Sequence, residues 1–104
     1  MPSELSADRF QQAVEAAPGS VVVCFRAPWC PACQRLAPVL EEVEGQLAGQ
    51  VAFYSVDTDH TPELAERFAL QAIPVLLRFE AGKQVGQLLG YRSEETVRGF
   101  ALGR

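Results

Sequence analysis

Two cysteines three residues apart, Cys30 and Cys33, are the residues whose types and spacing most directly indicate chemistry. At the start of a helix, positions i and i+3 share one face with Cβ atoms roughly 5–6 Å apart. Small local adjustments can then close the disulfide torsion. The spacing therefore predicts a pair of thiols that is oxidised and reduced without unfolding of the chain.

The neighbouring residues predict different roles for the two thiols. With Cys30 as the N-cap, Pro31 occupies the first helical position, where its missing amide costs nothing. The amides of Ala32 and Cys33 then point at the Cys30 sulfur, and the helix dipole adds to their effect. We therefore expect the Cys30 thiolate to attack substrates and Cys33 to resolve the resulting mixed disulfide.

A zinc site and a purely structural pair are the alternatives for these cysteines. Zinc requires four ligands, and beyond the pair the chain offers only Cys24 and His60. A structural role is disfavoured because Trp29, Pro31 and the position between an apolar run and a helical pattern fit redox chemistry. We expect no metal and no bound organic cofactor. His60, in a polar loop, is expected to be a solvated surface residue rather than a base.

Composition and charge indicate a globular protein. The chain has 104 residues, 48% of them hydrophobic and 21% charged, so we expect a single domain over residues 1–104. The formal charge of −4 argues against nucleic-acid binding. The sequence begins without a secretory signal and contains no stretch long enough to span a membrane, which predicts a cytoplasmic protein without membrane attachment. Nothing in it requires more than a monomer.

The order of elements places the dithiol between a strand and a helix. Periodicity and end signals predict helices over residues 7–16, 31–48, 62–68 and 94–101. Strands are predicted over residues 21–25, 51–56, 75–80 and 85–89. The first two strands flank a helix and should be parallel in a right-handed βαβ unit, whereas the last two form a hairpin.

With these motifs in this order, the sequence closely resembles the thioredoxin family from about Leu5 to Ala101. The resemblance is carried by Phe25-x-Ala27-x-Trp29-Cys30-x-x-Cys33, Ala37-Pro38, Val56-Asp57-x-Asp59, Pro62-Glu63-Leu64-Ala65, Ile73-Pro74-Val75, Phe79-x-x-Gly82 and Gly90. It implies an α/β thioredoxin fold, with a central mixed sheet of four to five strands flanked by helices. The implied activity is protein-disulfide reduction by the Cys30–Cys33 dithiol. The implied partners are substrate proteins with exposed disulfides and, as electron donor, a thioredoxin reductase or a small thiol.

The resemblance also implies a substrate groove beside the dithiol. The Ile73–Pro74 bond is expected to be cis, and the backbone of Ile73 is expected to pair with an extended substrate strand. The apolar rim of this groove is expected to include Trp29, Pro31, Ala72, Ile73, Pro74, Leu89, Gly90 and Tyr91.

Five residues are expected to tune the redox chemistry, namely Pro31, Ala32, Cys24, Arg26 and Asp59. The first four depart from the family pattern. Pro31-Ala32 replaces the usual Gly-Pro between the cysteines, and this pair sets redox poise. Cys24 stands where the family has a buried aspartate, and Ser55 where it usually has the accompanying lysine. We therefore expect slower resolution by Cys33, a hypothesis that Cys24→Asp would test by quickening exchange at neutral pH. Cys24 itself is interpreted as a small buried hydrophobe, the alternative being a second disulfide partner for Cys33.

Arg26 departs from the family as well, since a tryptophan is usual there. Its guanidinium either lowers the pKa of Cys30 or pairs with Asp59, and we expect the pair with Asp59. Pro31 and Arg26 also favour an alternative function, that of a disulfide oxidase or isomerase of the same fold. A redox-gated protein-binding module with little turnover is an alternative of another class, which negligible exchange with insulin would indicate.

Overall fold

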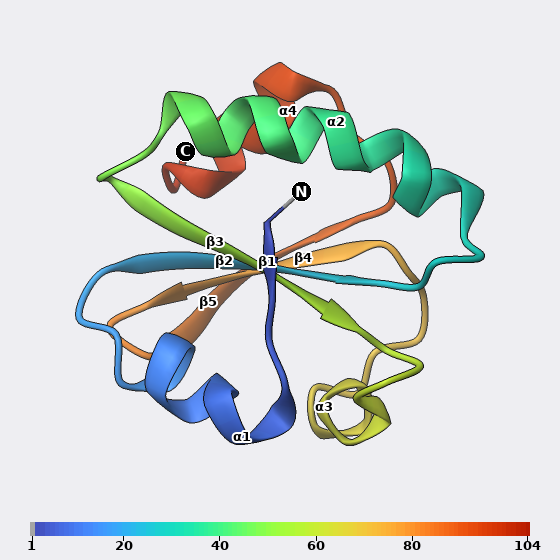
Figure 1. Ribbon diagram of the computed structural model, residues 1–104. Helices are drawn as coiled ribbons and strands as arrows, with labels where there is room; N and C mark the ends of the chain where they lie inside the picture. Colours follow the sequence, from blue (N-terminus) through green and yellow to red (C-terminus); the bar gives the residue numbers. More distant parts are fainter. Residues whose placement is uncertain (1) are drawn as a thin grey trace.

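A five-stranded β-sheet forms the centre of the computed structural model, which describes residues 2–104 (Figure 1). Its strands lie in the order β1-β3-β2-β4-β5. They span Ser3–Glu4 (β1), Ser20–Arg26 (β2), Val51–Asp57 (β3), Val75–Glu80 (β4) and Lys83–Leu89 (β5). β1, β3 and β2 are parallel to one another, whereas β4 is antiparallel to both β2 and β5. The predicted mixed sheet is confirmed.

Helices cover both faces of this sheet. They are α1 (Ala7–Phe10), the π-helical segment η1 (Gln11–Glu15), α2 (Pro31–Gln46), α3 (Pro62–Arg67) and α4 (Glu94–Ala101). Figure 1 shows α2 and α4 on one face and α1 and α3 on the other, with the sheet seen edge-on between them. Residues 2–104 contain no helix that is both long and apolar enough to cross a membrane.

β2 is buried on both faces because it lies in the middle of the sheet. Val21, Val23 and Phe25 face the core beneath α1 and α3. Val22 and Cys24 face the second core, which contains Leu36, Leu40 and Val43 of α2. Successive side chains of a strand point to opposite faces, so the continuous apolar run of β2 supplies both cores.

Several details of the elements differ from the predictions, among them the end of α2 at Gln46 rather than at residue 48. β1 was not predicted, because two residues carry no periodic signal and its pairing with β3 is a tertiary contact. β5 begins at Lys83 rather than at residue 85. The helix expected over residues 7–16 is α1 followed by η1, in which the Ala16 amide donates to the Gln11 carbonyl five residues back. Over so few residues, the spacing of apolar side chains does not distinguish an α-helix from the wider turn of a π-helix.

The sheet brings the dithiol motif beside the Ile73–Pro74 segment. β2 ends at Arg26, and the chain then leads into α2 at Pro31. Phe25 pairs with Val75 of the neighbouring strand β4, so the residues just after Phe25 and just before Val75 lie at the same edge. Residues more than 40 positions apart in sequence therefore form one site.

Candidate active site

Cys30 is the N-cap of α2, as the sequence predicts. Its backbone is extended, with φ −88° and ψ 113°, and Pro31 is the first helical residue. The Cys30 sulfur accepts a hydrogen bond from the Cys33 amide over 3.2 Å. Of the two amides expected to face this sulfur, that of Cys33 forms the bond. This donor, at the positive end of a 16-residue helix, favours negative charge on the Cys30 sulfur.

Cys33 lies one turn into α2 and is buried, with 4% of its surface exposed. Burial raises the pKa of its thiol to about 11, and the hydrogen bond with Cys30 acts in the same direction. A backbone hydrogen bond from Ala27 and the positive charge of Arg26 oppose this rise. Both cysteines are free thiols in the structure. At neutral pH Cys33 therefore holds its proton, which suits a thiol that reacts second.

The segment that precedes β4 lies against the Cys30 thiol. The Ile73–Pro74 peptide bond is cis, and the Ile73 carbonyl oxygen accepts a long hydrogen bond from the Cys30 thiol over 4.0 Å. The Gly90 amide donates to the Pro74 carbonyl over 2.8 Å. Gly90 has φ +77°, a conformation that glycine adopts at little cost. The structure thus brings together Cys30, Ile73, Pro74 and Gly90, four of the residues singled out from the sequence.

Three large apolar side chains are exposed here: Trp29, which precedes Cys30, and Leu89 and Tyr91, which flank Gly90. Their exposed fractions are 66%, 48% and 46%. The Arg35 guanidinium carbon lies 5.7 Å from the centre of the Tyr91 ring, a contact that was not predicted from the sequence. Gln34, also missed, donates to the Pro28 carbonyl over 2.8 Å and so ties the loop before Cys30 to α2. Neither contact follows a local pattern in the sequence.

The expected ion pair between Arg26 and Asp59 is wrong. Asp59 instead accepts a 2.9 Å hydrogen bond from the Trp29 indole nitrogen. Arg26 Nη2 lies 3.7 Å from Glu4 Oε1. Glu4 reaches this position because β1 pairs with β3, and β1 was not predicted. The pairing of β1 with β3 was not predicted from the sequence, and for this reason Glu4 was not considered as a partner of Arg26.

Arg26 and Cys33 line one cavity of about 230 Å³ at the carboxyl end of β2. Ala27, Pro28, Gln34 and Ala37 complete its lining. Arg26 Nε is buried and has no hydrogen-bond partner within residues 2–104. Burial raises the pKa of the Cys33 and Cys24 thiols, and the Arg26 guanidinium offsets part of that rise. The charge of Arg26 therefore acts on both of these sulfurs.

Cys24 is buried in the core beneath α2, with 2% of its surface exposed. Burial raises the pKa of its thiol to about 12, and repulsion from a Cys33 thiolate acts in the same direction. Ser55 is its register partner in β3, and the Ser55 hydroxyl donates to the Pro2 carbonyl. The aspartate and lysine expected from the family are thus replaced by two neutral side chains on adjacent strands, so no buried charge is left without a partner.

Asp57 is a residue of the site region whose structural role was missed. Its side chain is 5% exposed, and Oδ1 accepts hydrogen bonds from the amides of Asp59 and His60. An aspartate followed by polar loop residues is the usual signal for such a turn. Asp57 thereby orients the loop that presents Asp59 to Trp29.

A reactive thiol at the N-terminus of a helix, with a second buried thiol one turn later, defines the class of thiol–disulfide oxidoreductases. A family model described as Thioredoxin matches residues 2–101. The chain is 39% identical to the thioredoxin of Alicyclobacillus acidocaldarius over 88 residues, which are 85% of this chain and 83% of the relative. It is 33% identical to thioredoxin 1 of a Nostoc species, over 91% of this chain and 89% of the relative.

Thioredoxin 1 of Synechococcus elongatus is a third relative, 37% identical over 85% of this chain and 82% of its own length. The chain belongs to the thioredoxin family. It has the thioredoxin fold and is a thiol–disulfide oxidoreductase of the protein-disulfide reductase type. Both conclusions were expected from the sequence and are confirmed.

Proposed function

We propose that this protein reduces disulfides in other proteins, with Cys30 as nucleophile and Cys33 as resolving thiol. The observation that carries this assignment is the hydrogen bond from the Cys33 amide to the Cys30 sulfur. This donor favours a thiolate at Cys30, while burial raises the pKa of Cys33 and keeps that thiol protonated until it is needed. The two thiols thus differ in the way that a two-step exchange requires.

The exchange conserves atoms and electrons. The Cys30 thiolate attacks one sulfur of the substrate disulfide, forming a mixed disulfide and releasing the other sulfur as a thiolate. Cys33 then gives its proton to solvent or to the first released thiolate and attacks Cys30 Sγ. The bond between Cys30 Sγ and the substrate sulfur breaks, and this second sulfur leaves as a thiolate that takes a proton from solvent. The products are a Cys30–Cys33 disulfide and a substrate with two thiols, so two electrons pass to the substrate.

The groove for the substrate is proposed to be formed by Trp29, Ile73, Pro74, Gly90 and Tyr91. Trp29 and Tyr91 expose large rings, and the Ile73 carbonyl lies against the attacking sulfur. An extended peptide bound through backbone contacts at Ile73 would place its disulfide at Cys30. Because such contacts do not depend on side chains, this groove suits many different polypeptides.

The protein is proposed to act as a single domain over residues 1–104, as a monomer and without a bound cofactor. Electrons would come from a thioredoxin reductase or a small thiol, which would restore the dithiol after each turnover. Both donors operate in a reducing compartment such as the cytoplasm. Pro31 and Ala32, the residues between the cysteines, are proposed to set the redox potential.

Trapping of the mixed disulfide tests these roles. Cys33→Ser should hold labelled insulin with intact disulfides on Cys30 as a mixed disulfide, whereas Cys30→Ser should give no adduct. The matched control is Cys24→Ser, which removes the third thiol and should preserve insulin reduction. An adduct on Cys33 in the Cys30→Ser protein that forms as fast as the Cys30 adduct in Cys33→Ser would reverse the assignment.

A disulfide oxidase is the second candidate, and the position of Arg26 beside Cys33 favours it. A guanidinium that stabilises a thiolate stabilises the reduced form and makes the couple more oxidising. A glutathione redox titration read by alkylation separates the candidates. A potential near about −270 mV supports the reductase, and one between about −180 and −120 mV supports the oxidase.

A further inference from the structure

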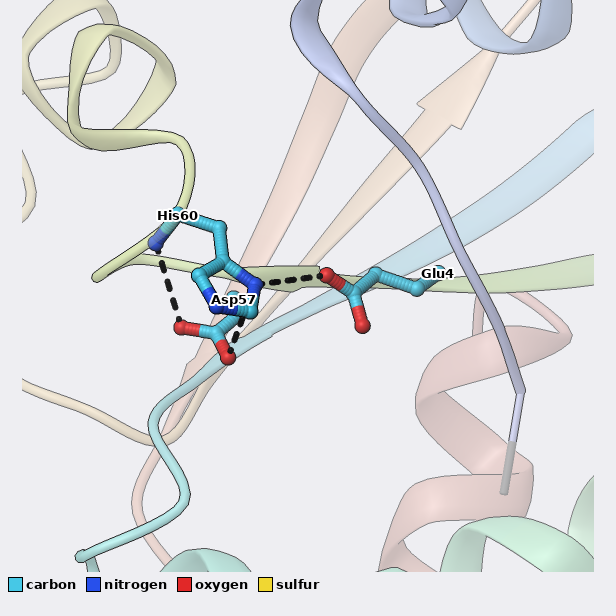
Figure 2. A group of neighbouring side chains, drawn as sticks. All are labelled: Glu4, Asp57 and His60. Carbon is cyan, nitrogen blue, oxygen red and sulfur yellow. Dashed lines mark hydrogen bonds and ion pairs between the residues drawn. The ribbon is translucent and has the colours of Figure 1, made fainter.

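Glu4, Asp57 and His60 converge at one edge of the sheet, outside the dithiol site. Glu4 ends β1, Asp57 ends the parallel strand β3, and His60 lies in the loop that follows. Figure 2 shows the imidazole between the two carboxylates. One potential ligand atom from each residue lies within 4.8 Å of the others. The carboxyl ends of neighbouring parallel strands thus bring three metal-ligating side chains together.

The separations around the imidazole nitrogen suit a shared ion better than hydrogen bonds. His60 Nδ1 lies 3.4 Å from Glu4 Oε2 and 3.5 Å from Asp57 Oδ2. Both exceed the usual 2.7–3.2 Å of an N–H···O bond, and a single Nδ1 proton serves only one oxygen well. For ligands about 2.0–2.2 Å from a tetrahedral metal, the edge of the tetrahedron is roughly 3.3–3.6 Å. The two separations match that edge.

Each carboxylate also directs one of its two oxygens at the His60 imidazole. Asp57 is nearly completely buried, with its side chain 5% exposed. Its Oδ1 accepts two backbone hydrogen bonds, while Oδ2 accepts none from residues 2–104 and points at His60 (Figure 2). Glu4 faces Arg26 with Oε1 and His60 with Oε2. Asp57 Oδ2 and Glu4 Oε2 therefore both face His60 Nδ1.

We propose that Glu4 Oε2, Asp57 Oδ2 and His60 Nδ1 bind a divalent first-row transition ion of the zinc class. An imidazole nitrogen with two carboxylate oxygens suits zinc, whereas calcium and magnesium take oxygen ligands. Two carboxylates balance the charge of the ion, and the exposed imidazole leaves a fourth position open to water. The shortage of ligands in the sequence argues against zinc at the dithiol. The site proposed here uses none of the cysteines and is independent of the proposed function.

His60 is the only histidine of the chain, so its ring nitrogens report on the site without overlap. The experiment titrates the full-length protein with Zn²⁺ alone, with Cys30 and Cys33 oxidised to remove the competing thiolates. Long-range ¹H–¹⁵N spectra identify the nitrogen that binds. We expect Nδ1 to shift and to saturate at one equivalent of zinc. Binding through Nε2, or no saturation, overturns the proposal.

Variants distinguish the built site from chance binding at a surface imidazole. Glu4→Gln should weaken zinc binding by more than about tenfold, since even groups behind a ligand contribute that much. Asp57→Asn should do the same, and circular dichroism checks that this buried variant folds. Glu95→Gln, an exposed acid at the start of α4, is the matched control and should bind as the wild type does. Equal affinity in Glu4→Gln and the wild type would mean an adventitious ion only.

Discussion

The indole nitrogen of Trp29 donates a 2.9 Å hydrogen bond to Asp59, although the Trp29 side chain is 66% exposed. This bond joins the loop before α2 to the loop after β3. The Asp59 amide is in turn held by Asp57 Oδ1 over 2.9 Å. The residue next to Cys30 is therefore oriented by a strand end rather than by packing.

Asp59→Ala should release the indole and weaken substrate binding. Loss of one hydrogen bond to a charged acceptor at the surface is worth about 1 kcal/mol, or roughly fivefold in KM for a protein disulfide, with kcat little changed. Trp29 is the only tryptophan, so its fluorescence anisotropy should fall in parallel. Asp59→Asn keeps an acceptor and should restore most of both readouts. Unchanged anisotropy in Asp59→Ala would contradict this account.

Arg26→Gln should make Cys33 less reactive, because the guanidinium lowers the pKa of that thiol. In a Cys30→Ser background, the pH profile of Cys33 alkylation should move to higher pH, with rates at pH 8 reduced several-fold. A shift of one unit corresponds to about 1.4 kcal/mol. Arg9→Gln, on the exposed side of α1, removes the same charge at a distance and should leave the profile in place. Identical profiles for both variants would show that Arg26 does not act on Cys33.

Cys24 should make the protein less stable at high pH. Its pKa is raised from 9.0 to about 12, chiefly by burial, so the folded state holds the proton more tightly than the unfolded state. The stabilisation is complete below pH 9 and is lost as the pH rises toward 12. The loss is about 1.4 kcal/mol per unit, or about 2 kcal/mol by pH 10.5.

Urea unfolding of the oxidised protein at pH 8 and pH 10.5 measures this loss, since Cys24 is then the remaining free thiol. Cys24→Ser is nearly isosteric and does not titrate in this range, so its stability should fall by about 2 kcal/mol less between the two pH values. Parallel losses in the two proteins would show that Cys24 ionises at its ordinary pKa.

Two glycine-to-alanine variants should change stability in opposite directions. Gly82, in the β4–β5 turn, has φ +83°, and a Cβ there would lie 2.1 Å from the Glu15 carbonyl oxygen. Gly82→Ala should therefore cost at least about 2 kcal/mol through strain and displacement of the loop. Gly45 lies within α2 with no atom within 4 Å of its Cβ position, so Gly45→Ala should stabilise by up to about 1 kcal/mol. Thermal unfolding of both variants measures the difference.

Local patterns were sufficient to predict the elements that position the dithiol. The apolar run of β2, the proline after Cys30 and the helical spacing of Leu36, Leu40 and Val43 each act over a few residues. Such signals depend on backbone geometry and side-chain period, which are properties of the sequence itself. The N-cap position of Cys30 and the Ser93 cap of α4 followed for the same reason.

The contacts around the dithiol were decided by the tertiary structure. Arg26 pairs with Glu4 instead of Asp59, because a two-residue strand with no periodic signal adds to the edge of β3. The same strand places Glu4 beside His60, 56 positions away in the chain. The sequence by itself determined which residues do redox chemistry and on which elements they lie. Their charge partners depend on strand order and register. These are set by which side chains are buried and how the strands pair across the whole sheet, and not by any short stretch of sequence.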